Sequence, residues 1–153
     1  MTTAPQKIGV IGLGFMGTPM AGHLIAADHQ LNIPTRSRVP EALAYGSATL
    51  CNSPKGVAER AGTVFLMLPD TPDAETVLFG AHRVAAGLSA GKTVVDMSSI
   101  SPIATKDFAG WIEALGCDHL THRCRAARSA QETPRCPSWS AATRRSSSAC
   151  GPC

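Results

Sequence analysis

Lys7-Ile8-Gly9-Val10-Ile11-Gly12-Leu13-Gly14-Phe15-Met16-Gly17 carries the strongest structural signal in this chain of 153 residues. Its first half is a short apolar run that ends in glycine, which is typical of a buried parallel strand. The residues Phe15–Ala27 then predict a helix, because Met16, Met20 and Leu24 recur at a spacing of four. The run therefore joins a strand to a helix through a turn that contains three glycines.

The alternation of strand and helix continues along the chain. Extended segments are predicted over three further ranges, His29–Thr35, Thr63–Pro69 and Thr93–Met97. Helices are predicted to begin at three pairs that end in proline, Ser53-Pro54, Thr71-Pro72 and Ser101-Pro102. The helix that begins at Ser53-Pro54 should stop at Ala61-Gly62, and the helix that begins at Ser101-Pro102 should stop near Leu115-Gly116. This alternation predicts an α/β fold of the Rossmann type, with a doubly wound parallel sheet.

The three glycines of the opening turn match the pattern G-x-G-x-x-G. Because this pattern lies between a strand and a helix, it strongly indicates a dinucleotide-binding site. Gly12 permits a tight turn, Gly14 lets the backbone approach a diphosphate, and Gly17 lets the helix pack close to the strand. The helix dipole favours the negative charge of the diphosphate. The predicted cofactor-binding residues of this turn are Gly12, Leu13, Gly14, Phe15, Met16 and Gly17. An ordinary strand-to-helix turn is the alternative.

The residues after the second strand bear on the choice between the two nicotinamide cofactors. NAD sites usually place Asp or Glu there against the ribose hydroxyls, whereas NADP sites place basic residues against the 2′-phosphate. This chain has Thr35-Arg36-Ser37-Arg38 and no acid. Two guanidinium groups with flanking hydroxyls suit a phosphate dianion, so the sequence favours NADP over NAD. The predicted contacts are Thr35, Arg36 and Ser37. A solvated basic loop is the alternative.

Two further loops are expected to line the same cleft, because ligands of such sheets lie beyond the carboxyl ends of the strands. One predicted strand ends at Leu68-Pro69-Asp70, and the next ends at Asp96-Met97-Ser98-Ser99. Of these residues, Leu68, Pro69, Ser98 and Ser99 are predicted to contact the cofactor. The two serine hydroxyls suit the nicotinamide ribose, and Ser99 also suits the substrate. Capping the next helix is the alternative role for these serines, although Ser101 is better placed for it.

The composition changes abruptly after Leu120. The segment 121–153 holds six of the 14 Lys and Arg residues, all of them Arg, and one acidic residue, Glu132. Four of the six cysteines also lie there, Cys124, Cys136, Cys150 and Cys153. No strand or helix periodicity survives in this segment. We therefore expect a boundary after Leu120, with residues 1–120 forming an NAD(P)-binding domain and residues 121–153 forming a disordered tail.

The bulk composition excludes several classes of protein. The net charge of +3 is too small to indicate a nucleic-acid partner. No apolar segment approaches the ~20 residues that a membrane span requires. The N-terminus lacks the apolar core of a signal peptide, so a cytoplasmic location is expected.

A zinc site or a redox dithiol is an alternative role for the cysteines near the C-terminus. The candidate residues are the C-x-x-C pair Cys150 and Cys153, together with His122, Cys124 and Cys136. A structural zinc site normally pairs two close ligand couples, so we expect no metal.

Three segments resemble those of the β-hydroxyacid dehydrogenases, in that family's order and spacing. They are Ile11–Ala21, Met67–Pro72 and Val95–Pro102. Together with Val77–Gly80, they are most similar to the branch of 2-hydroxy-3-oxopropionate (tartronate semialdehyde) reductases, which belongs to glyoxylate metabolism. The 3-hydroxyisobutyrate dehydrogenases share most of these residues. The resemblance covers residues 7–120. One departure is Asp28, where the family has glycine, and this change is expected to cost the preceding helix its C-terminal turn.

The resemblance implies hydride transfer between the nicotinamide ring and a small aldehyde or hydroxy acid, giving glycerate in the branch named, by a homo-oligomeric enzyme. It also implies a substrate loop, D-A-P-V-S-G-G, and a catalytic lysine on a later helix. The four lysines of this chain match no catalytic position of the family, and they are Lys7, Lys55, Lys92 and Lys106. We therefore expect a truncated, inactive form of such a reductase. The alternatives are a 3-hydroxyisobutyrate dehydrogenase-like enzyme and a non-catalytic dinucleotide-binding module.

A shift of reading frame accounts for the segment after Leu120. GC-rich codons for Thr121–Ala130, with one G restored in front, read D-A-P-V-S-G-G-E-V-G, which contains the implied substrate loop. The same shift explains the composition, because GC-rich codons read out of frame yield Arg, Ala, Ser, Pro and Cys. The shift is either a mutation or a sequencing error.

Overall fold

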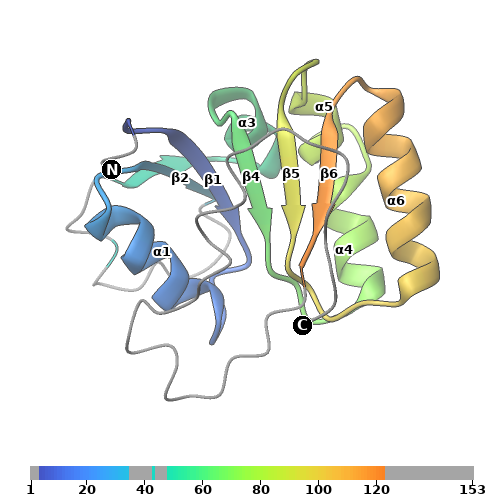
Figure 1. Cartoon of the computed structure of the whole chain (residues 1–153), viewed down its shortest axis with the longest axis horizontal. Helices are drawn as coiled ribbons and strands as arrows, with labels where there is room; N and C mark the ends of the chain where they lie inside the picture. Colours follow the sequence, from blue (N-terminus) through green and yellow to red (C-terminus); the bar gives the residue numbers. More distant parts are fainter. Residues whose placement is uncertain (1–3, 35–42, 44–47, 123–153) are drawn as a thin grey trace.

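A computed structural model of the chain describes residues 4–34, 43 and 48–122, and it contains a six-stranded sheet (Figure 1). The strands are β1 (Lys7–Ile11), β2 (Gln30–Pro34), β3 (Ala48–Cys51), β4 (Thr63–Leu66), β5 (Thr93–Asp96) and β6 (Asp118–Thr121). Their order is β3-β2-β1-β4-β5-β6, and every neighbouring pair is parallel. This order is that of the Rossmann fold, so the predicted fold class is confirmed.

Helices cover both faces of the sheet. The described helices are α1 (Gly17–Ala26), α3 (Pro54–Arg60), α4 (Thr71–Leu78), α5 (Val84–Gly87) and α6 (Pro102–Ala114). Helix α1 lies against one face, whereas α3, α4, α5 and α6 lie against the other (Figure 1). Buried side chains of α1 belong to one apolar cluster and those of the four later helices to a second. The connection through α1 therefore lies on one side of the sheet and the connections through the later helices lie on the other, as in a doubly wound sheet.

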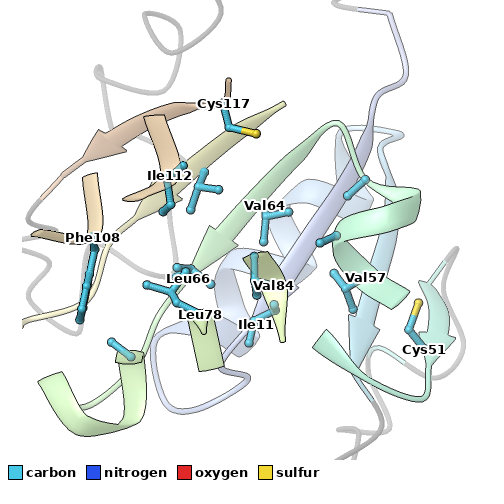
Figure 2. Close-up of a cluster of buried hydrophobic side chains, with 14 of the residues drawn as sticks. Ile11, Cys51, Val57, Val64, Leu66, Leu78, Val84, Phe108, Ile112 and Cys117 are labelled. Carbon is cyan, nitrogen blue, oxygen red and sulfur yellow. The ribbon is translucent and has the colours of Figure 1, made fainter. Parts of the chain in front are cut away.

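The larger of two apolar clusters lies between the sheet and the four later helices. In Figure 2, Val57 of α3, Leu78 of α4 and Ile112 of α6 converge on Val64 and Leu66 of β4. All five side chains are fully buried. Burial of a side chain of this size contributes about 1.5–3 kcal/mol relative to leaving it exposed. This cluster holds the helices at fixed positions on the sheet and thereby fixes where the loops at the carboxyl ends of the strands begin.

The three predicted helix starts are confirmed, and each carries a side-chain cap. The Ser53 Oγ accepts a hydrogen bond from the Gly56 N–H at 3.2 Å, and the Ser101 Oγ accepts one from the Ile103 N–H at 3.3 Å. The cap of α4 is Asp70, whose Oδ1 accepts from the Asp73 N–H at 3.1 Å. A proline in the first turn follows each cap, where its missing N–H costs nothing.

Three short elements were not predicted from the sequence, β3, α5 and β6. The edge strands β3 and β6 have only four residues each, two of which are exposed in β3 and three in β6, so neither has the long apolar run of a buried strand. They are recognised as strands through their pairing with β2 and β5. The last residue of β6 is Thr121, which lies one residue beyond the expected boundary between the domain and the tail. The tail residues 123–153, with their four cysteines, lie outside the described residues.

Two predicted elements are shorter than expected by more than one residue. The helix begins at Gly17, so Phe15 and Met16 belong to the turn that precedes it. The strand predicted over Thr63–Pro69 ends at Leu66. Its last three residues instead leave the sheet at its carboxyl edge. Both differences place more backbone in the loops that border the predicted cleft.

The expected loss of the C-terminal turn of α1 at Asp28 is wrong. The Asp28 N–H donates to the Ile25 carbonyl at 2.9 Å and the His29 N–H donates to the Leu24 carbonyl at 3.1 Å. This pair of hydrogen bonds is the Schellman motif, which requires a left-handed residue after the cap. Asp28 adopts that conformation, with φ at 62°, and no other described non-glycine residue has a positive φ. The turn is kept at the cost of backbone strain.

Replacing Asp28 by glycine should therefore stabilise the fold. Glycine adopts a positive φ without a Cβ clash, and we expect Asp28→Gly to raise the free energy of unfolding by about 0.5–1 kcal/mol. Ala27→Gly is the matched control, because Ala27 has a φ of −91° and no strain to relieve. The control should lose about 0.5–1 kcal/mol. Urea titration of both variants measures the difference, and equal losses in the two variants would contradict the strain at Asp28.

Candidate functional site: a dinucleotide cleft at the carboxyl edge

The turn between β1 and α1 brings three backbone segments into close contact. Gly12 has a φ of 100°, and a Cβ at this position would overlap the carbonyl of Met67. A Cβ at Gly17 would overlap the carbonyl of Gly12. The clashing atoms are backbone atoms of the same scaffold, so neither position tolerates a side chain. These contacts agree with the predicted roles of Gly12 in the turn and of Gly17 in helix packing.

Gly14 is in a different environment. A Cβ at this position would meet no described heavy atom within 4 Å, and its φ lies outside the left-handed region. Packing within the described residues therefore does not require a glycine at position 14. The open space lies beside the start of α1, where a bound diphosphate would need the backbone to be bare.

The start of α1 is suited to an anion. Its N-cap position is Met16, which makes no side-chain capping hydrogen bond, and the first turn holds no acidic residue. The turn is held instead from within, because the Thr18 N–H donates to the Gly14 carbonyl at 3.1 Å and the Thr18 Oγ1 donates to the Leu13 carbonyl at 3.3 Å. The positive end of the helix dipole therefore faces the space beside Gly14 without a competing carboxylate.

The other predicted residues of this turn differ in exposure. Leu13 is partly buried against the cluster under α1, and Met16 is partly buried. Phe15 is 64% exposed at the rim. Thr35, Arg36 and Ser37, which underlie the preference for NADP, lie outside the described residues.

The loops after β4 and β5 meet at the same edge of the sheet. The Leu68 N–H donates to the Ser98 Oγ at 2.9 Å, so the structure brings these two predicted residues together. The Ser101 N–H donates to the Thr71 Oγ1 at 3.1 Å and forms a second link between the two loops. Pro69 and Ser99 are exposed, whereas Ser98 is buried. Ser99 is therefore the serine of this pair that presents its side chain at the surface.

Asp96 belongs to this edge, at a strand end that was expected to line the cleft, although no contact or role was predicted for it. It is the last residue of β5 and is only 3% exposed. Its Oδ1 accepts from the Ser98 N–H at 2.9 Å, and its carbonyl accepts from the His122 N–H at 2.9 Å. The available sequence signal was a carboxylate at the end of an otherwise apolar strand.

His119 of β6 is the described histidine with a shifted pKa. Desolvation by burial lowers its pKa below the ordinary value of 6.5, and the nearby carboxylates Asp96 and Glu113 oppose this effect. Its Nε2 is buried and has no hydrogen-bond partner among the described residues. Because its pKa is lowered, the His119 imidazole is mainly neutral at neutral pH and does not present a full positive charge to a ligand.

Other candidate sites lie apart from the glycine turn. A depression of about 480 Å³ lies beyond the end of β2, and its lining includes Pro34, Ser53 and Arg83. Burial raises the pKa of the Cys51 thiol, which disfavours a reactive thiolate. Within the described ranges, no three residues of the types His, Cys, Asp and Glu are grouped to hold a metal ion. In the same ranges, none of the helices combines the length and hydropathy that a transmembrane segment requires.

The contrast between Gly14 and other glycines yields a direct test. Gly14→Ala should change the free energy of unfolding by less than about 0.5 kcal/mol, because the new methyl group meets no described heavy atom within 4 Å. The same methyl group should weaken NADPH binding by about tenfold or more, since it occupies the space that the diphosphate requires.

Gly22→Ala in α1 is the matched control, because a Cβ there also meets no atom of the described residues within 4 Å. It should keep the affinity and gain about 0.5–1 kcal/mol of stability from the loss of a helical glycine. Calorimetric titration and urea unfolding measure the two quantities. Unchanged NADPH affinity in Gly14→Ala would show that the diphosphate binds elsewhere.

Comparison with known proteins agrees with this geometry. Residues 7–122 match the family model described as the NAD binding domain of 6-phosphogluconate dehydrogenase. The chain is 47% identical over 115 residues to 2-hydroxy-3-oxopropionate reductase of Escherichia coli K12, covering 75% of this chain and 39% of that protein. It is 36% identical over 110 residues to 3-sulfolactaldehyde reductase of the same strain, covering 71% of this chain and 37% of the relative.

Solved structures agree in fold. An imine reductase from Myxococcus stipitatus in complex with NADP+ superimposes with a TM-score of 0.72 at 23% identity, over 79% of this chain and 42% of that chain. Its V8 variant in complex with NAD+ gives 0.73 at the same identity, over 80% of this chain and 42% of the variant.

The chain thus spans about two fifths of the length of the curated relatives named above. Members of the matched family are NAD(P)-dependent oxidoreductases that act on CH–OH groups. The glycine turn, the strand order and the family match over residues 7–122 lead to one conclusion: the chain belongs to the β-hydroxyacid dehydrogenase family, as its NAD(P)-binding Rossmann domain.

Proposed function

We propose that this chain is the cofactor-binding part of an NAD(P)H-dependent reductase that converts 2-hydroxy-3-oxopropionate to glycerate. The space beside Gly14 at the uncapped start of α1 carries the cofactor part of this proposal. The substrate part is supported by identity, which is 47% to the Escherichia coli enzyme of that name and 36% to the 3-sulfolactaldehyde reductase. Homo-oligomeric assembly of the intact enzyme is part of the same proposal.

The residues of this chain bind and orient rather than react. When bound, a reduced nicotinamide cofactor supplies the hydride for the aldehyde carbon. The turn Gly12–Gly17 holds the diphosphate with its backbone, and the linked loops after β4 and β5 form the next part of the cleft. Ser99, which is exposed beside the buried Ser98, is placed to contact the nicotinamide end or the substrate.

The choice of NADP over NAD rests on Thr35-Arg36-Ser37-Arg38. These residues follow Pro34, the last residue of β2, which is the strand whose end contacts the adenosine ribose in such folds. Two arginines in place of an acid favour the 2′-phosphate. Solved structures of this fold include complexes with NADP+ and with NAD+, so the fold accommodates either cofactor.

We also propose that the segment after Leu120 is read out of frame and that this chain lacks turnover. The proposal is supported by the restored reading D-A-P-V-S-G-G and by the absence of lysine from residues 121–153. Two of the four described lysines make other contacts: Lys55 pairs with Glu59 at 3.7 Å, and the Lys92 Nζ donates to the carbonyls of Ala58 and Glu59. Reading the coding DNA across the Leu120 codon tests the frame directly, and a verified sequence with no missing base removes the proposal.

A 3-hydroxyisobutyrate dehydrogenase-like activity is the second candidate. It is supported by 37% identity over 97 residues to a probable 3-hydroxyisobutyrate dehydrogenase-like protein of Arabidopsis thaliana. Lower identity over a shorter match ranks it behind the first candidate. Comparing the two substrates on a gene with the restored frame separates the candidates.

The purified chain should bind cofactor without catalysing a reaction. We expect calorimetry to show NADPH binding, with weaker binding of NADH because of Arg36 and Arg38. We expect no NADPH oxidation when tartronate semialdehyde is added, since loss of a general acid typically costs about 10²–10⁴ in rate and loss of substrate orientation costs more. Absence of binding to either cofactor would contradict the proposed function, and measurable NADPH oxidation would contradict only the lack of turnover.

A further inference from the structure

The hydrogen-bond ladder between β4 and β5 ends just before the cleft. Its last backbone bond joins the Met97 N–H to the Leu66 carbonyl at 2.9 Å. Beyond this point each strand runs into a loop that is predicted to contact the cofactor. Two loops that leave a sheet separately need another connection if their relative position is to be fixed, because an unpaired loop samples many backbone conformations.

A side-chain relay extends the connection beyond the ladder. The Asp96 Oδ1 accepts from the Ser98 N–H at 2.9 Å, which closes a short turn at the end of β5. The Ser98 Oγ in turn accepts from the Leu68 N–H at 2.9 Å. Asp96 and Ser98 are both at least nine-tenths buried, so water competes little for these bonds. The relay therefore joins the end of β5 to the loop after β4 across 30 residues of sequence.

Burial of the Asp96 carboxylate at this position costs free energy. Strand β5 is otherwise apolar around it, since Val94 is fully buried and Val95 is nearly so. Burial of a carboxylate costs several kcal/mol unless hydrogen bonds compensate. The Oδ2 of Asp96 is buried and has no hydrogen-bond partner among the described residues. Among the described residues, the hydrogen bond from the Ser98 N–H is thus the one that offsets the cost of burying the Asp96 carboxylate. We take the relay as the reason for an acidic residue at this position.

We propose that Asp96 is a positioning residue of the cofactor cleft, which acts by holding Ser98 so that its hydroxyl fixes the Leu68 backbone. The proposal rests on the cofactor binding described above and deepens it. Asp96 does not touch the cofactor in this account. It sets the position of Leu68 and Pro69 relative to Ser98 and Ser99, and the Ser101–Thr71 bond holds the outer end of the same two loops.

The test is a double-mutant cycle on the full 153-residue chain, with NADPH affinity as the readout. Asp96→Ala and Ser98→Ala should each weaken NADPH binding by about tenfold, since each removes one buried hydrogen bond of the relay. Because the two residues act in series, Asp96→Ala/Ser98→Ala should bind no more weakly than the weaker single variant. Asp96→Asn should restore binding to within about threefold, because its Oδ1 still accepts from the Ser98 N–H.

Val94→Ala is the matched control for lost stability. It truncates a fully buried residue of the same strand without touching the relay. It should lower the melting temperature and leave NADPH affinity unchanged. A loss of affinity in Val94→Ala equal to that in Asp96→Ala would mean that both variants act through general destabilisation, which overturns the positioning role. Additive effects in the double variant, or no recovery in Asp96→Asn, overturn it as well.

Amide hydrogen exchange tests the relay without cofactor. In Ser98→Ala the Leu68 amide should exchange at least about tenfold faster, while amides of β1 keep their rates. In Asp96→Ala the amides of Ser98 and Leu68 should both accelerate. If Asp96→Ala does not fold, Ser98→Ala decides alone, because it removes a single oxygen from the middle of the relay. If the Leu68 amide exchanges at an unchanged rate in Ser98→Ala, the relay is overturned. If that amide exchanges faster in Ser98→Ala but the unmodified chain binds no cofactor, the relay stands and the proposed function fails.

Discussion

Close contact between backbone segments at the end of β1 is the constraint on which the rest of the site depends. The Gly12 carbonyl lies where a side chain of Gly17 would begin, and the Met67 carbonyl lies where a side chain of Gly12 would begin. Because these contacts leave no room for a Cβ, the start of α1 is held directly against β1 and the end of β4. The helix dipole and the bare backbone at Gly14 therefore face one fixed point at the carboxyl edge of the sheet. A diphosphate bound there would be held by the backbone rather than by charged side chains.

The carboxyl edge gathers the other parts of the site for the same geometric reason. All six strands are parallel, so their ends lie along one edge, and the loops after β1, β4 and β5 are neighbours there. Backbone bonds from Met67 to Ile11 and from Met97 to Leu66 carry the pairing to this edge. Asp96, Ser98 and Thr71 then extend it into the loops with side chains. The apolar cluster behind β4 holds the helices on which these loops depend (Figure 2).

The sequence predicted the parts of this structure that depend on local pattern. The glycine spacing, the capped helix starts and the apolar central strands each have a local physical cause, and all were found. The edge strands β3 and β6 were missed because short exposed strands are defined by their pairing partners rather than by their own residues. The role of Asp96 was missed for a related reason. Its importance lies in a contact between Ser98 and Leu68, which are 30 residues apart. At Asp28 the local rule identified the unusual residue correctly but not the outcome, since the backbone hydrogen bonds of the turn are kept with a φ of 62° at this residue.

The central claim is that backbone amides at the start of α1 receive the diphosphate of a dinucleotide. Titration of NADPH into the ¹⁵N-labelled chain, followed by NMR, tests this claim directly because it reports each amide separately. The account predicts that the amides of residues 14–17 show the largest shift changes, followed by Leu68 and Ser98, while the amides along α6 stay unchanged. Large changes confined to other segments, with residues 14–17 unmoved at saturation, would contradict it.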